Sequence, residues 1–144
     1  MAGSITAANA IFQLDIPDIF AAPQQLQGFA ADDIFGTDDQ QTVQTQMGVD
    51  GLLSAGFVFV ETSQRITLQA DSPSNEVFDQ WNGAQQAALD AFPASAVIIL
   101  PALRKKWQMT RGFLTSYKPI PDAGKVLRAR TFTITWQRNG LAPI

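Results

Sequence analysis

Apolar and polar residues alternate along most of the chain, which is the two-residue period of strands with one buried face. The alternation is clearest over 65–70 and 131–136, where Ile, Leu, Phe and Trp alternate with Thr and Gln on the opposite face of the strand. The segments 57–60 and 97–100 are apolar on both faces, which predicts burial inside a sandwich or barrel, or beneath a partner. Further strand-like segments run over residues 11–20, 26–35, 43–47 and 107–117.

One segment changes to a helical period. Ser72 and Pro73 suit the N-cap and first position of a helix, because Pro lacks only an N–H that would have no partner there. Pro93 ends the pattern, so we predict one helix over about 73–92. Its predicted buried face consists of Val77, Phe78, Trp81, Ala84, Ala88, Leu89 and Phe92.

The large aromatic residues follow the same two periods, helical in the first part and alternating in the last. This spacing is typical of burial, so we predict that they form the core rather than a ligand cage. The set is Phe78, Trp81, Phe92, Trp107, Phe132 and Trp136.

Residues 36–56 predict an extended loop or hairpin between early strands. A polar stretch, 36–42, precedes the alternating segment 43–47, and Asp50-Gly51 predicts a two-residue turn because both types tolerate positive φ. The expected fold is α+β but mainly β: an antiparallel β-sandwich or barrel with one flanking helix. Residues 1–144 form one domain, in which residues 1–10 are flexible or ordered by a partner.

The chain contains no Cys and no His, which excludes thiolate nucleophiles, disulfides and the usual histidine general base. Paired aspartates at 32–33 and 38–39 offer oxygen ligands, but they lack the spacing of a calcium-binding loop. Nothing places the two glutamates, Glu61 and Glu76, together for acid–base chemistry. We therefore expect no enzymatic activity, no cofactor and no metal.

Membrane insertion and secretion are also not expected. The first basic residue is Arg65, so the start of the chain lacks the basic region of a signal peptide. The longest apolar stretch, 91–103, contains two prolines and is shorter than the roughly 20 residues of a membrane span. We expect a protein made in the cytoplasm.

Charge divides the chain into two unequal parts. Residues 1–100 carry 12 acids and one base, whereas residues 101–144 carry nine bases and one acid. The basic part has three interpretations: a surface that meets acidic surface on another subunit, a nucleic-acid-binding module, or ordinary solvated charge. Its basic and aromatic members are Arg104, Lys105, Lys106, Trp107, Arg111, Arg128 and Arg130.

Over about residues 11–138 the chain resembles the tail tube proteins of contractile-tailed bacteriophages, whose fold is similar to that of the type VI secretion tube protein. The residues that carry the resemblance are GFAADDIF at 28–35, MGVDG at 47–51, ITLQADSPSN at 66–75 and TFTITW at 131–136.

The resemblance implies a virion structural protein that forms hexameric rings, stacked into the inner tube through which viral DNA is ejected. It implies as partners other copies of the chain, the sheath protein, the tape-measure protein, and baseplate and tail-terminator proteins. The expected location is the virion tail, with assembly in the host cytoplasm. A baseplate tube-initiator ring has the same fold and is the alternative role. The family has no catalytic residues.

Head-to-tail stacking requires one surface to complement a different surface of an identical copy. The uneven charge of the chain would satisfy this requirement if acids of one subunit approach the bases at 104–111 of its neighbour. The candidate interface residues are Asp32, Asp33, Asp38, Asp39, Met47, Asp50, Leu52, Arg104, Lys105, Lys106 and Arg111.

Overall fold

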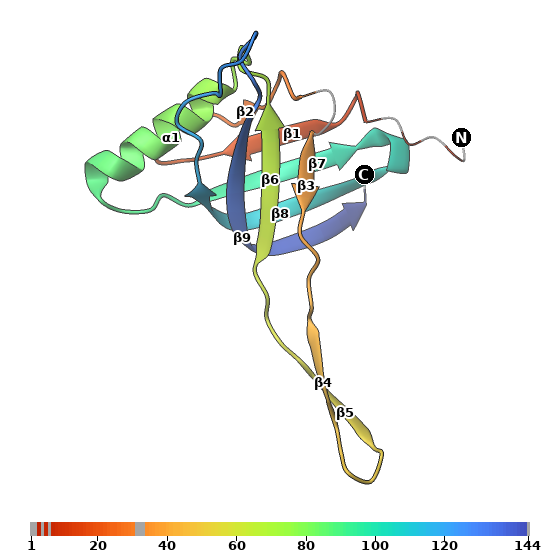
Figure 1. Cartoon of the computed structure of the whole chain (residues 1–144). Coiled ribbons are helices and arrows are strands. Elements are labelled where there is room, and N and C mark those ends of the chain that lie inside the picture. Colours follow the sequence, from red (N-terminus) through yellow and green to blue (C-terminus); the bar gives the residue numbers. More distant parts are fainter. Residues whose placement is uncertain (1–2, 4, 6, 31–33, 144) are drawn as a thin grey trace.

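The computed structural model describes residues 3, 5, 7–30 and 34–143. A curved seven-stranded antiparallel sheet forms a half-barrel in the order β2-β1-β7-β8-β9-β6-β3, with helix α1 beside it (Figure 1). A separate two-stranded hairpin, β4-β5, projects away from the body. The elements are β1 (Ile11–Asp15), β2 (Gln24–Gln25), β3 (Phe35–Thr37), β4 (Val43–Met47), β5 (Leu53–Phe57), β6 (Thr62–Leu68), α1 (Asn75–Ala88), β7 (Ala94–Leu100), η1 (Pro101–Leu103), β8 (Lys105–Ser116) and β9 (Arg130–Pro143). The predicted mainly β fold, with one helix and an extended hairpin, is confirmed.

The core lies between one face of the sheet and α1. The ring of Phe78 on the helix stacks on Phe132 of β9, with centroids 4.3 Å apart. Phe12 of β1 meets Phe35 of β3 edge-on at 5.7 Å, which brings the two sides of the half-barrel together. Of the aromatics predicted to form the core, four are fully buried and two are half-buried against it, namely Phe92 and Trp107.

The predicted strand over 26–35 is wrong. Gly28 has a φ of 68° and interrupts the extended backbone, and only an isolated bridge joins Phe29 to Leu68 before β3 begins at Phe35. A Cβ on Gly28 would lie 2.6 Å from Ser72 Oγ, so both the backbone angle and the packing require glycine. The chain uses this region to pass closely over the turn between β6 and α1.

The helix begins and ends inside the predicted range. Ser74, not Ser72, is the N-cap, because residues 72–77 first form a tighter turn with Asn75 N–H bonded to Ser72 O at 3.2 Å. The helix ends at Ala88, and Leu89 follows in the left-handed conformation. Ala88 and Leu89 are therefore exposed rather than part of the buried face.

The Ser-Pro-Ser-Asn segment at 72–75 fastens the start of the helix to the chain before β3. The Ser74 hydroxyl accepts the Gln27 N–H at 2.7 Å, and the Ser72 hydroxyl donates to the Gln27 carbonyl. The Asn75 amide donates to the carbonyls of Gln69 at 2.9 Å and Ala70 at 3.2 Å. The segment that carried part of the family resemblance therefore has a structural role.

The two segments predicted to be apolar on both faces differ in outcome. Strand β7 lies inside the sheet between β1 and β8, with Ala94, Ala96 and Ile98 buried and Val97 and Ile99 half-buried. Residues 57–60 lie outside the core of this chain, where the side chains of Phe57 and Phe59 are 67% and 88% exposed. Phe57 and Phe59 of the second segment are therefore left uncovered by their own chain, whereas Val58 and Val60 are half-buried.

Candidate assembly surface

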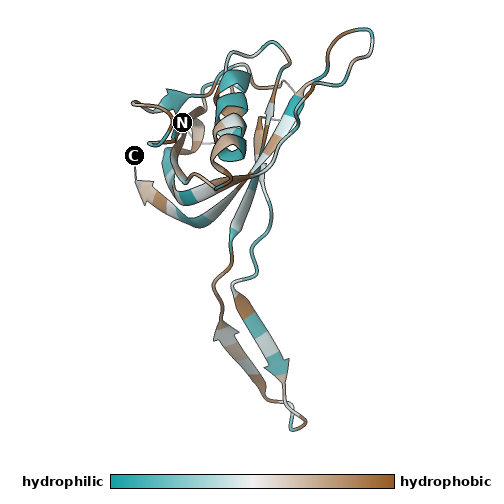
Figure 2. Ribbon diagram, turned by 90° about the vertical axis from the view of Figure 1, so that its left-hand side faces the viewer, coloured by the Kyte–Doolittle hydropathy of each residue, from teal (hydrophilic) through white to brown (hydrophobic). Residues whose placement is uncertain are grey.

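The hairpin and its two connecting segments, residues 38–61, form a projection that we call the arm (Figures 1 and 2). The arm continues the antiparallel pairing of β3 with β6, since Thr37 pairs with Gln64 and Val43 with Phe57. The returning segment carries one more residue than the outgoing one between these pairs. This extra residue is typical of a bulge, which bends a strand pair.

One face of the arm is apolar and uncovered. Val43, Thr45 and Met47 pair with Phe57, Ala55 and Leu53, and directly paired residues share a face of the ladder. Gln44, Gln46, Ser54 and Gly56 occupy the opposite face. Every residue of β4 and β5 is exposed, including Val43 at 54%, Met47 at 63% and Phe57 at 67%. An isolated two-stranded hairpin is at best marginally stable in water, so this face requires a covering surface.

The tip of the arm is a three-residue loop, Val49-Asp50-Gly51, rather than the predicted two-residue turn. The Gly51 N–H bonds to Gly48 O at 3.0 Å, and the Gly48 N–H bonds to Leu52 O at 2.8 Å. Gly51 has a φ of 85°, as the last position of such a loop requires. The Asp50 carboxylate accepts the Leu52 N–H at 3.1 Å, which braces the tip.

Polar side chains anchor the arm to the body. The Asn139 amide of β9 donates to Gln40 Oε1 at 3.0 Å and to Thr62 Oγ1 at 2.7 Å. The Gln40 amide in turn donates to Thr62 Oγ1 at 2.7 Å. These bonds hold the first segment of the arm against the start of β6, so the projection leaves the body in a defined direction.

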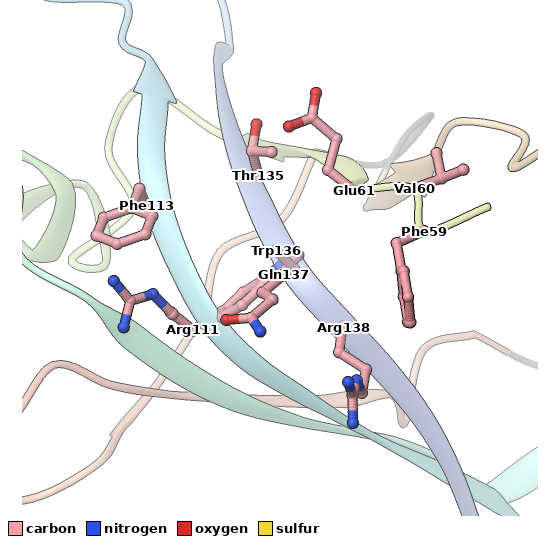
Figure 3. A pocket seen from close by; sticks show the side chains of 9 residues that line it. All are labelled: Phe59, Val60, Glu61, Arg111, Phe113, Thr135, Trp136, Gln137 and Arg138. Carbon is pink, nitrogen blue, oxygen red and sulfur yellow. The ribbon is translucent and has the colours of Figure 1, made fainter.

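An open hollow of about 600 Å³ lies at the base of the arm (Figure 3). Arg111 lies in a bulge of β8 opposite β7, with a φ of 49°, and its guanidinium lies 5.6 Å from the ring centroid of Phe113. Among the residues that the structure describes, no three carboxylate, His or Cys side chains are placed to bind a metal ion. The lining residues are Phe59, Val60, Glu61, Arg111, Phe113, Thr135, Trp136, Gln137 and Arg138.

The predicted acidic interface residues lie at separate places. Asp38, directly after the edge strand β3, pairs with Arg65 of β6 in the same chain, and Asp39 follows it in the arm. Asp50 lies at the tip together with Leu52, close to Met47 at the end of β4. Asp32 and Asp33 lie outside the described residues. The structure thus gathers Met47, Asp50 and Leu52 at one end of the arm.

The predicted basic residues lie on the body. Arg104 follows η1 with a φ of 54°, and Lys105 and Lys106 open β8 beside the C-terminal end of β9. Arg111 lies farther along β8, in the hollow at the base of the arm. None of the described acidic candidates is ion-paired with these four bases within one chain. A pairing of Asp38, Asp39 or Asp50 with these bases would therefore join different copies.

Arg130, predicted as part of the basic surface, is instead buried, so that prediction is wrong. Its guanidinium bonds to Asp79 of α1 at 2.8 Å and to the Lys118 carbonyl at 2.8 Å, and it lies 4.9 Å from the Phe132 ring centroid. The hydroxyl of Tyr117 donates to the same carboxylate. Buried charge must be paired, so this group fixes the helix to the sheet and cannot bind phosphates.

The protonation of this cluster is shifted. Burial raises the pKa of Asp79, but hydrogen bonds from Arg130 and Tyr117 and the charge of Arg130 outweigh that effect and lower it overall. Burial and the hydrogen bond to Asp79 raise the pKa of Tyr117. Asp79 stands 51 positions from Arg130, and neither the helical nor the strand period relates the two residues.

No helix within the described part of the chain is long and apolar enough to cross a membrane.

The half-barrel with its helix and arm is a fold found in contractile injection systems. The cap that terminates the tube of the anti-feeding prophage matches with a TM-score of 0.66 at 13% identity, over 100% of this chain and 94% of that one. A sheath/tube terminator of an extracellular contractile injection system matches with a TM-score of 0.65 at 13% identity, over 99% of both chains. A chain of the sheath-tube complex of such a system matches with a TM-score of 0.66 at 14% identity, over 100% of this chain and 95% of that one.

The family model described as Tail fiber protein gp32 matches residues 3–140. The chain belongs to this family, and it is therefore related to the proteins of phage tails. No curated protein sequence matches significantly. The relation to phage tails that the resemblance implied is confirmed, whereas the assignment to the tube itself stays a prediction, because the family's description names a tail fiber protein.

Proposed function

We propose that this protein is a virion structural subunit that assembles into hexameric rings, which stack as the inner tube of a contractile phage tail. The observation that carries the proposal is the arm, whose apolar face is exposed along its whole length. Burying a Val, Leu, Met or Phe side chain stabilises a contact by about 1.5–3 kcal/mol. Several such residues on one arm can therefore join neighbouring subunits.

The partners in this proposal follow from the place of the rings in the inner tube of the tail. Sheath protein would surround the rings, and the tape-measure protein and then viral DNA would occupy the channel. Baseplate and tail-terminator proteins would contact the two ends of the tube. The likeness in fold to a chain of a sheath-tube complex supports the proposal.

A terminal ring is the second candidate role. Two of the matched structures are a tube-terminating cap and a sheath/tube terminator, and another belongs to a baseplate. A terminal ring uses the same lateral contacts as a tube ring but stacks on one side only. The two roles therefore differ in whether purified rings polymerise.

The test is electron microscopy and sedimentation of the purified protein at increasing concentration. A tube subunit should form rings with a central channel and then stacks, whereas a terminal ring should stop at single rings. A variant in which a short Gly-Ser linker replaces residues 43–57 should remain a folded monomer. A wild-type protein that is monomeric in intact phage particles would contradict both roles.

A further inference from the structure

The loop between β8 and β9, residues 117–129, lies at the end of the molecule opposite to the arm (Figure 1). We call it the crown loop. It is ordered by its own backbone, since the Arg128 N–H bonds to Asp122 O at 2.8 Å and Ala123 forms a bridge with Leu127. Three of its apolar side chains are nonetheless exposed: Ile120 at 73%, Val126 at 77% and Leu127 at 61%.

The crown loop also borders an open hollow of about 640 Å³. Val126, Leu127 and Ala129 form one side of this hollow, and the turn after β6, with Ala70 and Asp71, forms the other. A concave surface with exposed aliphatic side chains fits a small apolar projection better than a flat surface.

Charge distinguishes the crown loop from the arm. The loop carries Lys118, Lys125 and Arg128 against one acid, Asp122, which pairs with Lys118 at 3.0 Å. Among the described residues, Lys125 and Arg128 have no acidic partner. The arm, residues 38–61, contains four acids and no base. The crown loop and the arm are thus opposite in net charge, and Asp71 of the turn after β6 adds one acid to the hollow.

The tip of the arm has the matching shape and chemistry. Val49 is fully exposed at the outermost turn, with Leu52 at 67% beside it. Asp50 lies between them and uses Oδ1 for the Leu52 N–H, so that Oδ2 remains available to a cation. This is a small apolar knob with one carboxylate.

We propose that the arm tip of one copy seats in the crown-loop hollow of the next copy, with Val49 and Leu52 against Val126 and Leu127, and Asp50 beside Lys125 and Arg128. This proposal rests on the proposed function and specifies its axial contact. Because the two surfaces lie at opposite ends, each docked copy presents a free tip or a free hollow, and the contact propagates as an open stack.

Disulfide cross-linking tests this contact directly, since the chain has no cysteine of its own. The double variant Val49→Cys/Leu127→Cys should give a ladder of covalent oligomers when assemblies are oxidised. The matched control is Val49→Cys/Leu89→Cys, because Leu89 is also exposed, at the end of α1. The control should give no ladder.

A charge exchange gives a second, independent measurement. Asp50→Lys should raise the concentration needed for assembly by about tenfold, because it places like charges together. Asp50→Lys/Arg128→Asp should restore assembly, whereas Asp50→Lys/Arg138→Asp should not, since the exposed Arg138 lies on β9, outside the crown loop.

The outcomes separate the two proposals. If Val49→Cys/Leu127→Cys forms rings or tubes but gives no covalent ladder on oxidation, the axial contact is wrong. The same holds if Arg128→Asp does not restore assembly of Asp50→Lys. Neither result would contradict the proposed role as a ring subunit. A wild-type protein that forms no rings under any condition, and is monomeric in particles, would overturn both.

Discussion

Gly112 of β8 packs flat against the indole ring of Trp136 of β9, its partner across the ladder. A Cβ at position 112 would lie 2.7 Å from Cδ2 of the ring, with two further ring carbons nearer still. Trp136 cannot move away, because it is fully buried and its Nε1–H donates to the buried Gln64 Oε1 at 3.0 Å. The absence of a side chain at 112 is therefore what admits Trp136, one of the two tryptophans of the core.

Gly112→Ala should consequently lower the free energy of unfolding by about 1–3 kcal/mol, the usual cost of overpacking a core. Urea denaturation followed by tryptophan fluorescence measures this value. Gly83→Ala is the control, because a Cβ there meets nothing within 4 Å and alanine favours a helix. If both variants are equally stable, the close packing on Trp136 is not a constraint.

Ser74→Ala should destabilise the junction between α1 and the loop before β3. The variant leaves the half-buried Gln27 N–H without its acceptor, at a cost of about 1–3 kcal/mol. Ser54→Ala on the exposed β5 should change the free energy of unfolding by less than about 0.5 kcal/mol. Thermal melts of the two variants compare these values directly, and equal melting temperatures would contradict the role given to Ser74.

The sequence located the central strands well, because burial on one face imposes a two-residue period that can be read without a structure. Strands β6 and β9 alternate cleanly for this reason, and their residues pair in register from Thr62 with Trp136 to Leu68 with Arg130. The start of α1 was misplaced by two residues, since Ser72 and Ser74 are equally good caps by type. Both serines bond to Gln27, which is remote in sequence, and the tighter turn over 72–77 moves the N-cap to Ser74.

The candidate surface was predictable only in part. An alternating hairpin has the same pattern whether its apolar face is covered by its own chain or by another, so the pattern predicted β4 and β5 but not their exposure. The burial of Arg130 depends on Asp79, which approaches only when the helix packs on the sheet. The crown-loop residues Val126 and Leu127 carry no periodic signal.

The Asp79–Tyr117–Arg130 cluster should give stability a defined dependence on pH. The pKa of Asp79 is lowered in the folded state, so its contribution is fully present above the unfolded value of about 4 and is lost as pH falls through the folded value. The pKa of Tyr117 is raised, so its contribution is present below about 10 and is lost as pH rises through the folded value.

Two variants separate the loss of stability at acid pH from the loss at alkaline pH, when the free energy of unfolding is measured by urea titration at each pH. Asp79→Asn should lower stability near neutral pH by about 1–3 kcal/mol and flatten the decline below pH about 4. Tyr117→Phe should keep most of the acid decline, because the Asp79–Arg130 pair remains, and should remove the alkaline one. If the stability of Asp79→Asn declined at acid pH as steeply as that of the wild type, Asp79 would not be the group responsible for the decline.

Reversal of the charges at 104–106 should impair assembly more than folding. Arg104 and Lys105 are exposed at the start of β8, so Arg104→Glu/Lys105→Glu/Lys106→Glu should melt close to the wild type. The variant places acids where the neighbouring copy is expected to present acids, so stacking should be lost. Substitution of all three by Gln should have an intermediate effect. Sedimentation velocity measures stacking, and unchanged tubes in the Glu variant would contradict this electrostatic contribution.

The apolar face of the arm provides the most direct separation of assembly from folding. Phe57 is two-thirds exposed, so Phe57→Gln should change the free energy of unfolding of the monomer by less than about 0.5 kcal/mol. In a ring the same substitution removes an apolar side chain from a buried contact, which costs about 2 kcal/mol per subunit. The concentration for half-maximal assembly should therefore rise by more than about tenfold. Ser54→Gln, on the opposite face of the same hairpin, is the matched control and should assemble normally. If the two variants assemble equally well, the apolar face is not the surface that joins the subunits, and the arm must act through its tip or its polar face instead.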